Sequence, residues 1–254
     1  MRWFSPRAFR VWQRNRDVFF ALSRTEVSGL LAEPLLVLLA MGFGLGAYIG
    51  LVDGEEYIEF IAPGIIAGYA MFSAVFECTY GSFVRMDYQR TYDAIMATPL
   101  SAEDIIAGEI FWGATRALIT TTAVMLVATM FGLIDSWTAL LALPVSIISG
   151  LMFASIALTF TSIAPSISSF NYFYTLIITP MFYFSGVFFP IDGFPSIVRK
   201  LSWIAPLTPV AEITRSVVQR ELRLGLLWAL FLMLAVTAVF FCLSLRLMRR
   251  RLLR

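Results

Sequence analysis

The sequence of 254 residues contains no histidine and only two cysteines. Without an imidazole group the chain cannot build a catalytic triad that relies on histidine, and it offers no histidine ligand to a metal. Cys78 and Cys242 both lie inside apolar runs, so we expect neither a disulfide framework nor a cysteine-rich metal site. These absences exclude several common kinds of active site and metal centre.

Lysine is also nearly absent, since it occurs only at Lys200. The phosphate-binding loop of many ATPases requires a Gly-Lys-Ser or Gly-Lys-Thr run, whereas Lys200 follows an arginine and precedes a leucine. The chain therefore cannot bind ATP in the manner of these proteins. If it takes part in ATP-driven transport, another polypeptide must hydrolyse the ATP.

Charged residues make up only 14% of the chain, against about 25% in a soluble domain. Apolar residues make up 59%, and the mean hydropathy is +0.81. A soluble fold of this length cannot bury so much apolar surface, and disordered chains are polar instead. The composition predicts an all-α integral membrane protein.

Six stretches are apolar enough to cross a bilayer, which needs about 20 residues per helix. A link of only four residues, 135–138, joins the third stretch to the fourth, so these two helices should be antiparallel neighbours. The predicted spans are 34–52, 61–84, 106–134, 139–164, 170–189 and 225–246.

Arginines concentrate on one side of these spans and predict that both termini are cytoplasmic. They lie in the N-terminal arm, after the second span and in the tail: Arg2, Arg7, Arg10, Arg14, Arg16, Arg24, Arg85, Arg90, Arg246, Arg249, Arg250, Arg251 and Arg254. The opposite links at 53–60, which begins with Asp53, and at 135–138 carry no basic residue. The segment 190–223 is the exception, with Arg199, Lys200, Arg215, Arg220 and Arg223.

The N-terminal arm, residues 6–24, is predicted to form an amphipathic helix in the cytoplasmic interface. Ser5-Pro6 is typical of a helix start. One side of this helix would carry Phe9, Trp12, Phe19 and Phe20, and the other Arg7, Arg10, Arg14 and Asp17. It could be a plain membrane anchor or a lever between a cytoplasmic partner and the first span.

The segment 85–98, between the second and third spans, has mixed charge. Arg90, Asp93 and Ala97 fall at helical spacing, and Pro99 should end that helix. Ser101 and Asp104 predict a capping box that opens the next span. The segment would be either a rigid projection for a partner or a solvated connector.

Glu77, Glu109 and Arg116 lie inside predicted spans. A charge at membrane depth costs at least ~2.5 kcal/mol and needs a partner or a role. The second and third spans are antiparallel, so Glu77 and Arg116 could meet at similar depth. They could form a structural ion pair or take a substrate-facing or gating role, and proton coupling is a further option.

Two other features of the spans allow two interpretations. Gly42, Gly44, Gly46 and Gly50 form a stripe of small residues, which suits close helix packing or contact with a second copy. The aromatic run at 170–189 could line a path for an amphipathic substrate, or it could face lipid and core. The candidate path residues are Tyr174, Phe182, Tyr183 and Phe184.

Four prolines divide the outer segment 190–223 into pieces, two of which should be helical: Ser196–Ala205 and Pro209–Arg220. Ile197, Leu201 and Ile204 form an apolar face on the first, and Val210, Ile213 and Val217 form one on the second. Neither helix can span a bilayer. Together they predict a re-entrant hairpin, shielded by protein.

Several motifs, in collinear order from about residue 26 to 220, resemble those of the type-2 ABC export permeases. They are GFGLG (42–46), FECTYGSFVRMDYQRTYDAI (76–95), LSAEDIIAGEIFWGATRA (100–117), ITPMFYFSGVFFPID (178–192) and APLTPVAEITR (205–215). Within the family, they are most similar to the nodulation J subgroup, the membrane half of a lipo-chitooligosaccharide exporter. Pro209 stands where the family usually has histidine.

The resemblance implies one six-span transmembrane domain, 1–254, that dimerises and pairs with two separate ATPase subunits. It implies a transport subunit of the bacterial inner membrane rather than an enzyme, with no cofactor of its own and no nucleic-acid partner. ATP and Mg²⁺ would be held by the ATPase, and the cargo would be a lipid-linked oligosaccharide. The segment 85–98 would be the coupling helix, with the N-terminal helix as a second contact and 190–223 as the outer hairpin. The residues expected at the ATPase contact are Arg85, Asp87, Arg90, Thr91 and Asp93.

Three rival functions remain open from the sequence. An exporter of a hydrophobic drug or antibiotic would belong to the same class. An ion-coupled secondary transporter would use Glu77 or Glu109 and would work without an ATPase. A membrane-bound enzyme fits less well, because the sequence shows no cluster of polar catalytic groups at one interface.

Overall fold

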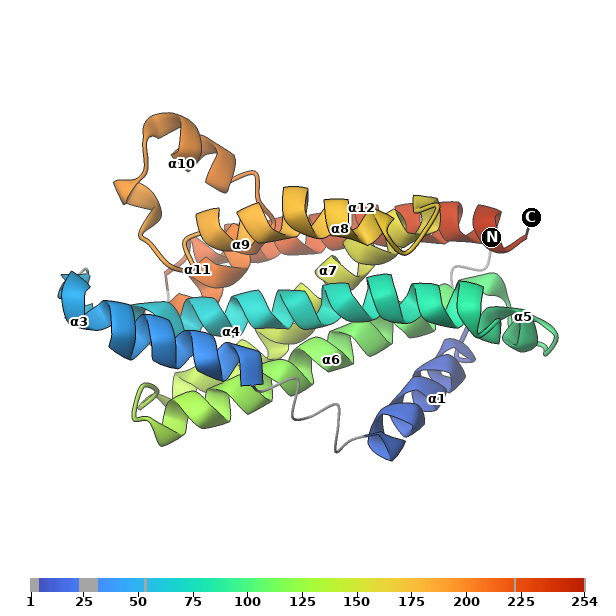
Figure 1. Cartoon of the computed structure of the whole chain (residues 1–254), viewed down its shortest axis with the longest axis horizontal. Coiled ribbons are helices and arrows are strands. Elements are labelled where there is room, and N and C mark those ends of the chain that lie inside the picture. Colours follow the sequence, from blue (N-terminus) through green and yellow to red (C-terminus); the bar gives the residue numbers. More distant parts are fainter. Residues whose placement is uncertain (1–4, 23–31, 53, 222, 254) are drawn as a thin grey trace.

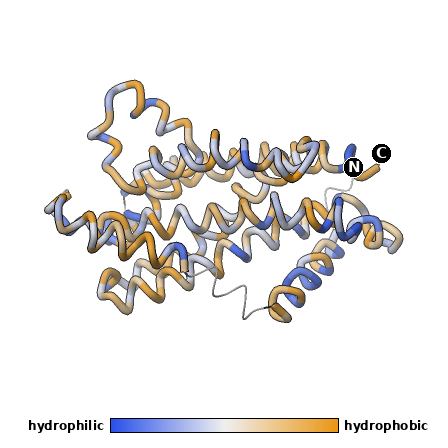
Figure 2. The backbone as a smooth tube through the Cα atoms, in the orientation of Figure 1, coloured by the Kyte–Doolittle hydropathy of each residue, from blue (hydrophilic) through white to orange (hydrophobic). Residues whose placement is uncertain are grey.

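Five long apolar helices form the body of the protein in the computed structural model, which describes residues 5–22, 32–52, 54–221 and 223–253. The helices run side by side along the longest axis (Figure 1). Each is long and apolar enough to cross a membrane: Ala32–Ile49, Tyr57–Tyr88, Ala102–Met130 (α6), Trp137–Ile163 and Leu226–Leu252 (α12). Figure 2 shows that these helices are mostly hydrophobic, whereas the N-terminal helix carries many hydrophilic residues.

Three of these long helices are built from several pieces. The second comprises α4 (Tyr57–Phe76) and two π-helical segments, η2 (Glu77–Gly81) and η3 (Val84–Tyr88). The fourth comprises a 3-10 turn, η4 (Trp137–Leu141), and α7 (Ala142–Ile163). The first includes a π segment, η1 (Ala40–Leu45), followed by α3 (Gly46–Ile49).

The predicted span 170–189 is a shorter helix in three pieces: α8 (Ser169–Phe173), η5 (Tyr174–Ile178) and α9 (Thr179–Phe184). At 1.5 Å per residue it covers about 24 Å, less than the ~30 Å of a bilayer core. Gly186 takes a φ of 80° just beyond it, a left-handed conformation that glycine adopts without strain and that turns the chain. A sixth complete span therefore stays a prediction.

The second and third spans begin about a turn earlier than predicted. Ser101 and Asp104 form the predicted capping box, and α6 starts directly after it, at Ala102. Glu56 and Glu59 form a similar box at the start of α4. Before α4, a two-residue strand β1 (Leu51–Val52) pairs antiparallel with β2 (Glu55–Glu56). Predictions for Arg2, Arg24, Asp53 and Arg254 lie outside the described residues.

The N-terminal helix α1 (Ala8–Ala21) packs along α6 at the end of the bundle that carries α5 (Figure 1). Phe9 and Phe20 of the predicted apolar side are more than half exposed on the protein surface, and the interfacial position of this helix stays a prediction. The buried stripe follows helical spacing and shares only Phe19 with the predicted apolar side: Ala8, Val11, Asn15 and Phe19. A neighbouring helix, rather than the interface alone, decides which side of α1 is buried.

The segment between the second and third spans is shorter than predicted. Residues 84–88 continue the helix of the second span as η3, so the predicted start of the loop at Arg85 was wrong. The projecting helix α5 covers Thr91–Met96, and Arg90 precedes it in a left-handed conformation, with a φ of 52°. Arg90 and Asp93 form the exposed ion pair that the spacing allows, at 3.7 Å.

The outer segment contains a 3-10 turn, η6 (Ile191–Gly193), and both predicted helices, with different bounds. These are α10 (Ser196–Ser202) and α11 (Leu207–Val218). The apolar face of α11 is buried against α4 and α12, whereas α10 projects from the bundle (Figure 1) with Ile197 and Ile204 about three-quarters exposed. A re-entrant hairpin stays a prediction, and only α11 packs within the bundle.

Glycines set the distance between helices at particular positions. A Cβ atom on Gly108 of α6 would lie 2.8 Å from the carbonyl oxygen of Ala8 in α1, and one on Gly42 would lie 2.5 Å from Ile58 of α4. A Cβ atom on Gly44 would meet no atom of the described part of the chain within 4 Å. Within the predicted glycine stripe, close packing therefore requires Gly42 but not Gly44.

We predict that Gly108→Ala destabilises the protein by about 1–3 kcal/mol, because the added methyl group forces the backbone of α1 away from α6. Thermal unfolding in detergent measures the loss, and faster tryptic cleavage at Arg10 or Arg16 reports the release of α1. Gly44→Ala is the matched control and should be neutral or slightly stabilising. Equal behaviour of the two variants would contradict this role of Gly108.

Candidate functional site

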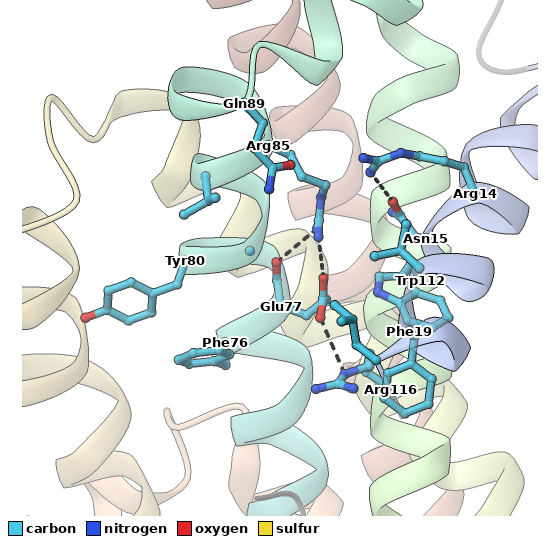
Figure 3. A pocket seen from close by; sticks show the side chains of 14 residues that line it. Arg14, Asn15, Phe19, Phe76, Glu77, Tyr80, Arg85, Gln89, Trp112 and Arg116 are labelled. Atoms are coloured by element: carbon cyan, nitrogen blue, oxygen red, sulfur yellow. Dashed lines mark hydrogen bonds and ion pairs between the residues drawn. The ribbon is translucent and has the colours of Figure 1, made fainter. Parts of the chain in front are cut away.

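Four charged side chains from two neighbouring helices meet inside the bundle, and Figure 3 shows three of them: Glu77, Arg85 and Arg116. Arg85 lies between two carboxylates: its Nη1 atom is 2.7 Å from Oε1 of Glu77, and its Nε atom donates to Oε1 of Glu109 at 3.1 Å. Arg116 places its Nε atom 3.4 Å from Oε2 of Glu77. We call Glu77, Arg85, Glu109 and Arg116 the charge cluster; its two carboxylates balance its two guanidinium groups.

The predicted meeting of Glu77 and Arg116 is present, but Arg85 makes the shorter contact with Glu77. Arg85 was predicted at the ATPase contact, and its side chain instead points into the bundle with 13% exposed. A charge buried at this depth is costly unless it is paired. The two acidic groups and the two arginines therefore require one another.

The π-helical segments explain how Arg85 reaches the cluster. In a regular α-helix, residues eight positions apart point about 80° away from each other. A π segment inserts an extra residue into the turn, so that Glu77 and Arg85, separated by η2, face α6 together. Gly81 leaves room for this contact, since a Cβ atom there would lie 2.9 Å from Oε1 of Glu77.

Helix α1 is joined to the charge cluster by a direct hydrogen bond. Asn15 is buried, and its Nδ2 atom donates to Oε1 of Glu109 at 3.0 Å. Arg14 in turn donates to Oδ1 of Asn15 at 3.0 Å, and the Arg116 guanidinium lies 4.7 Å from the centre of the Phe19 ring. A movement of α1 relative to α6 would therefore break contacts of both a carboxylate and a guanidinium.

Helix α5 approaches the same cluster through Tyr92, whose side chain is only 1% exposed. Burial raises the pKa of Tyr92 well above its usual value, the Glu109 carboxylate raises it further, and Arg85 opposes the shift. The hydroxyl therefore stays neutral beside the cluster. On the same short helix Asp93 is exposed, as is Arg90 just before it, and Thr91 is partly exposed.

Ionic and polar contacts also join the chain segments that lie near α5, at the same end of the bundle as the charge cluster. Asp87, another residue predicted at the ATPase contact, is exposed and lies 3.8 Å from Arg251 near the end of α12. Arg249 pairs with Glu103 at 3.1 Å. The carboxylate of Asp104 accepts bonds from the backbone and hydroxyl of Ser5. These contacts tie the start of α1 and the end of α12 to α6 and η3.

A cavity of about 290 Å³ lies beside the cluster, between α1, α6 and the second span (Figure 3). Arg14, Glu77, Arg85 and Arg116 line it together with the rings of Phe76 and Tyr80. Burial, and then repulsion from Arg85, lower the pKa of Arg14. Among the described residues, no group of three or more cysteine, aspartate or glutamate side chains could hold a metal ion.

The four candidate path residues do not share one surface. Phe182 is buried and contacts Phe72 edge to face, with ring centres 4.9 Å apart, whereas Tyr183 and Phe184 are about half exposed. The ring of Tyr174 stacks on that of Phe72, with ring centres 6.5 Å apart. A role of these side chains in a substrate path stays a prediction.

Sequence reasoning missed Asn15, Tyr92 and the true position of Arg85. A buried amide on an otherwise amphipathic arginine-rich helix was the available signal for Asn15. Tyr92 and Arg85 gave no such signal, because their inward direction depends on the π segments and on the fold of α5 against the bundle.

Comparison with known proteins adds a family and named relatives. Residues 9–219 match the ABC-2 type transporter family. Nodulation protein J of Sinorhizobium fredii is 39% identical over 243 residues, which cover 96% of this chain and 93% of that relative. Nodulation protein J of Rhizobium leguminosarum bv. viciae is 38% identical over 245 residues, with 96% and 94% covered. The inner membrane transport permease YadH of Escherichia coli is 27% identical over 200 residues, with 78% and 77% covered.

We predict that Arg85→Met destabilises the protein by about 3–5 kcal/mol, because it leaves two buried carboxylates without their main partner. Thermal unfolding of the purified protein in detergent measures the effect. Arg90→Met removes an exposed arginine nearby and should change stability by no more than about 0.5 kcal/mol.

A double-mutant cycle checks the individual pairs. Glu77→Ala combined with Arg116→Ala should cost less than the sum of the two single changes, and Glu77→Ala with Arg85→Met should show the larger coupling. Additive losses in both cycles would contradict the pairing.

Proposed function

Because this chain belongs to the ABC-2 type transporter family, as its motifs predicted, we propose that it is the permease of an ATP-driven exporter. Members of this family are membrane permease components rather than catalytic subunits, and they normally work with an ATPase partner. The absence of a Gly-Lys-Ser/Thr run supports the proposal, since this chain could not supply a P-loop itself. ATP and Mg²⁺ would bind to two copies of the separate ATPase.

The proposed membrane is the bacterial inner membrane, with both termini in the cytoplasm. The name of one relative, an inner membrane transport permease, supports this location. The positive-inside rule supports the orientation: α5, the arginine-rich end of α12 and the arginines of α1 lie at one end of the bundle. This end would face the ATPase, and the end with α10 and α11 would face outward.

The proposed cargo is an amphipathic lipid-linked oligosaccharide, moved outward by a dimer of this permease, each copy being one transmembrane domain, 1–254. Relatives 38–39% identical over nearly the whole chain carry the name nodulation protein J, and the motif resemblance implied a lipo-chitooligosaccharide exporter. An exporter of hydrophobic drugs would share the architecture but has no observation of its own in its favour.

Coupling between the ATPase and the permease would pass through α5. Arg90 and Asp93 face outward and would contact the ATPase, while Tyr92 reaches inward to the charge cluster. Helix α1 reaches the same carboxylate, Glu109, through Asn15. The single observation that carries this proposal is that both candidate contact elements meet one buried ion network. A displacement of either would change the pairing that holds the second span against α6.

An ion-coupled mechanism has less support from this geometry. Glu77 and Glu109 each contact a guanidinium group of the charge cluster, so the carboxylates that an ion-coupled carrier would use are engaged in buried ion pairs.

We predict that the purified chain in vesicles moves no cargo by itself, with or without a proton gradient. Adding its cognate ABC ATPase and ATP should produce vectorial transport of a fluorescent lipid-linked oligosaccharide. The control is the same ATPase with its P-loop lysine replaced. Transport by the permease alone would contradict the proposed function.

We predict that reversing the charges on α5, as Arg90→Glu with Asp93→Lys, abolishes cargo-stimulated ATPase activity without unfolding the permease, because both side chains are exposed. The ATPase rate of the reconstituted complex measures this. Arg199→Glu reverses an exposed charge at the opposite end and should retain stimulation. Full stimulation in the α5 variant would contradict the docking role.

A further inference from the structure

A second cavity, of about 520 Å³, lies at the end of the bundle opposite the charge cluster. Its walls come from the start of α4, the turn after α9, α11 and the start of α12. The volume falls within the roughly 300–1,000 Å³ of small-molecule sites. In the proposed orientation it faces outward, where the cargo would leave.

Ser185 gives this cavity an unpartnered polar group. Its side chain is fully buried and lines the cavity, and its hydroxyl has no hydrogen-bond partner among the residues that the structure describes. Buried hydroxyl groups in proteins are almost always bonded. An Oγ atom at a cavity wall can donate to, and accept from, a ligand with hydroxyl groups.

The wall beside Ser185 is held in place by Arg215. The Nη2 atom of Arg215 donates to the carbonyl oxygen of Gly186 at 2.8 Å and to that of Phe60 at 3.3 Å. Its guanidinium also lies 4.1 Å from the centre of the Phe60 ring. These contacts connect α11 to α4 and to the turn after α9. The cavity therefore has a preformed wall, which reduces the cost of ordering it around a ligand.

The polar lining is rich in acceptors and carries an excess of negative charge. Carboxylates from Glu55, Asp192, Glu212 and Glu221 line the cavity, against the guanidinium groups of Arg215 and Arg223. This balance disfavours a phosphate or another anion. Gln219 donates to Glu55 and Arg223 pairs with Glu221, so these groups hold one another in place, and the exposed Glu212 is an acceptor for a neutral ligand that donates hydroxyl hydrogens.

Aromatic surface completes the lining. Trp203, half exposed just after α10, and Phe60 both contribute to the cavity. A sugar ring presents a face of C–H groups as well as hydroxyl edges, and the electron-rich face of an indole attracts such groups. An indole next to carboxylates and an amide matches both surfaces of a sugar.

We propose that this cavity binds the saccharide part of the cargo on the outward side, as a neutral polyhydroxylated oligosaccharide. The proposal rests on the proposed export function and adds a binding site and a substrate class. Trp203 stacks on a sugar ring, Ser185 bonds a hydroxyl at the buried wall, and Glu212 accepts hydroxyl hydrogens.

The test uses the full chain, purified in detergent with its ATPase, and isothermal titration with chitotetraose, a neutral tetrasaccharide without a lipid. Saturable binding is expected. Trp203→Ala should weaken it about tenfold through the lost stacking, and Ser185→Ala and Glu212→Gln by about threefold each. Glu212→Gln changes an exposed side chain of equal size, so misfolding cannot account for its effect.

Trp137→Ala is the matched control, because Trp137 is also exposed at this end, on η4, and does not line the cavity. It should bind chitotetraose as the native chain does. No saturable binding by the native chain, an equal loss in Trp137→Ala, or preferential displacement by dodecyl phosphate would each overturn the proposal.

A parallel assay of ATP-driven transport in vesicles separates the two proposals. Transport by the native complex without chitotetraose binding would reject the saccharide site and leave the exporter standing. Binding that depends on Trp203, without any ATP-driven transport, would support the site and reject the exporter.

Discussion

A guanidinium group buried between carboxylates of two different helices constrains the rest of this protein. Arg85 and Glu77 belong to the second span and Glu109 to α6, and none of the three charges could remain at this depth without the others. The contact fixes the rotation of the second span about its axis, which in turn requires the π-helical turn at Glu77–Gly81. The position of α6 relative to that span follows from the same contact.

The network also links elements that lie outside the long helices. Asn15 of α1 and Tyr92 of α5 both reach the surroundings of Glu109, although α1 and α5 are far apart in the sequence. Low-dielectric surroundings make each such contact costly to lose. Small movements of α1 or α5 would therefore alter the packing of the spans. A permease that is driven by a separate ATPase would require such a linkage.

The two cavities differ in the sign of the charge that predominates in their lining. Arginines outnumber carboxylates in the cavity beside the charge cluster, whereas carboxylates outnumber arginines in the cavity at the opposite end, which also has an amide and an indole in its lining. Helix α10 projects next to the second cavity with an exposed apolar face. Polar and apolar surfaces therefore meet at the end where the cargo would leave.

Local features of the sequence were enough to predict the membrane class, most spans, the capping box at Ser101 and the meeting of Glu77 with Arg116. Apolar composition and capping act within one segment, so they can be recognised without knowing what the segment contacts. The missing P-loop lysine likewise excludes a kind of chemistry by itself. Family motifs in collinear order then identified the permease class.

Only the tertiary structure decided which way Arg85 points, which side of α1 is buried, how far the helix Ser169–Phe184 extends, and that α11 packs while α10 does not. Each of these depends on helical rotation or on a neighbouring surface. A single extra residue in a π turn rotates the following side chains by about 100°. Such a shift leaves the amino-acid composition unchanged, yet it moves a charge from a loop into the interior of the bundle.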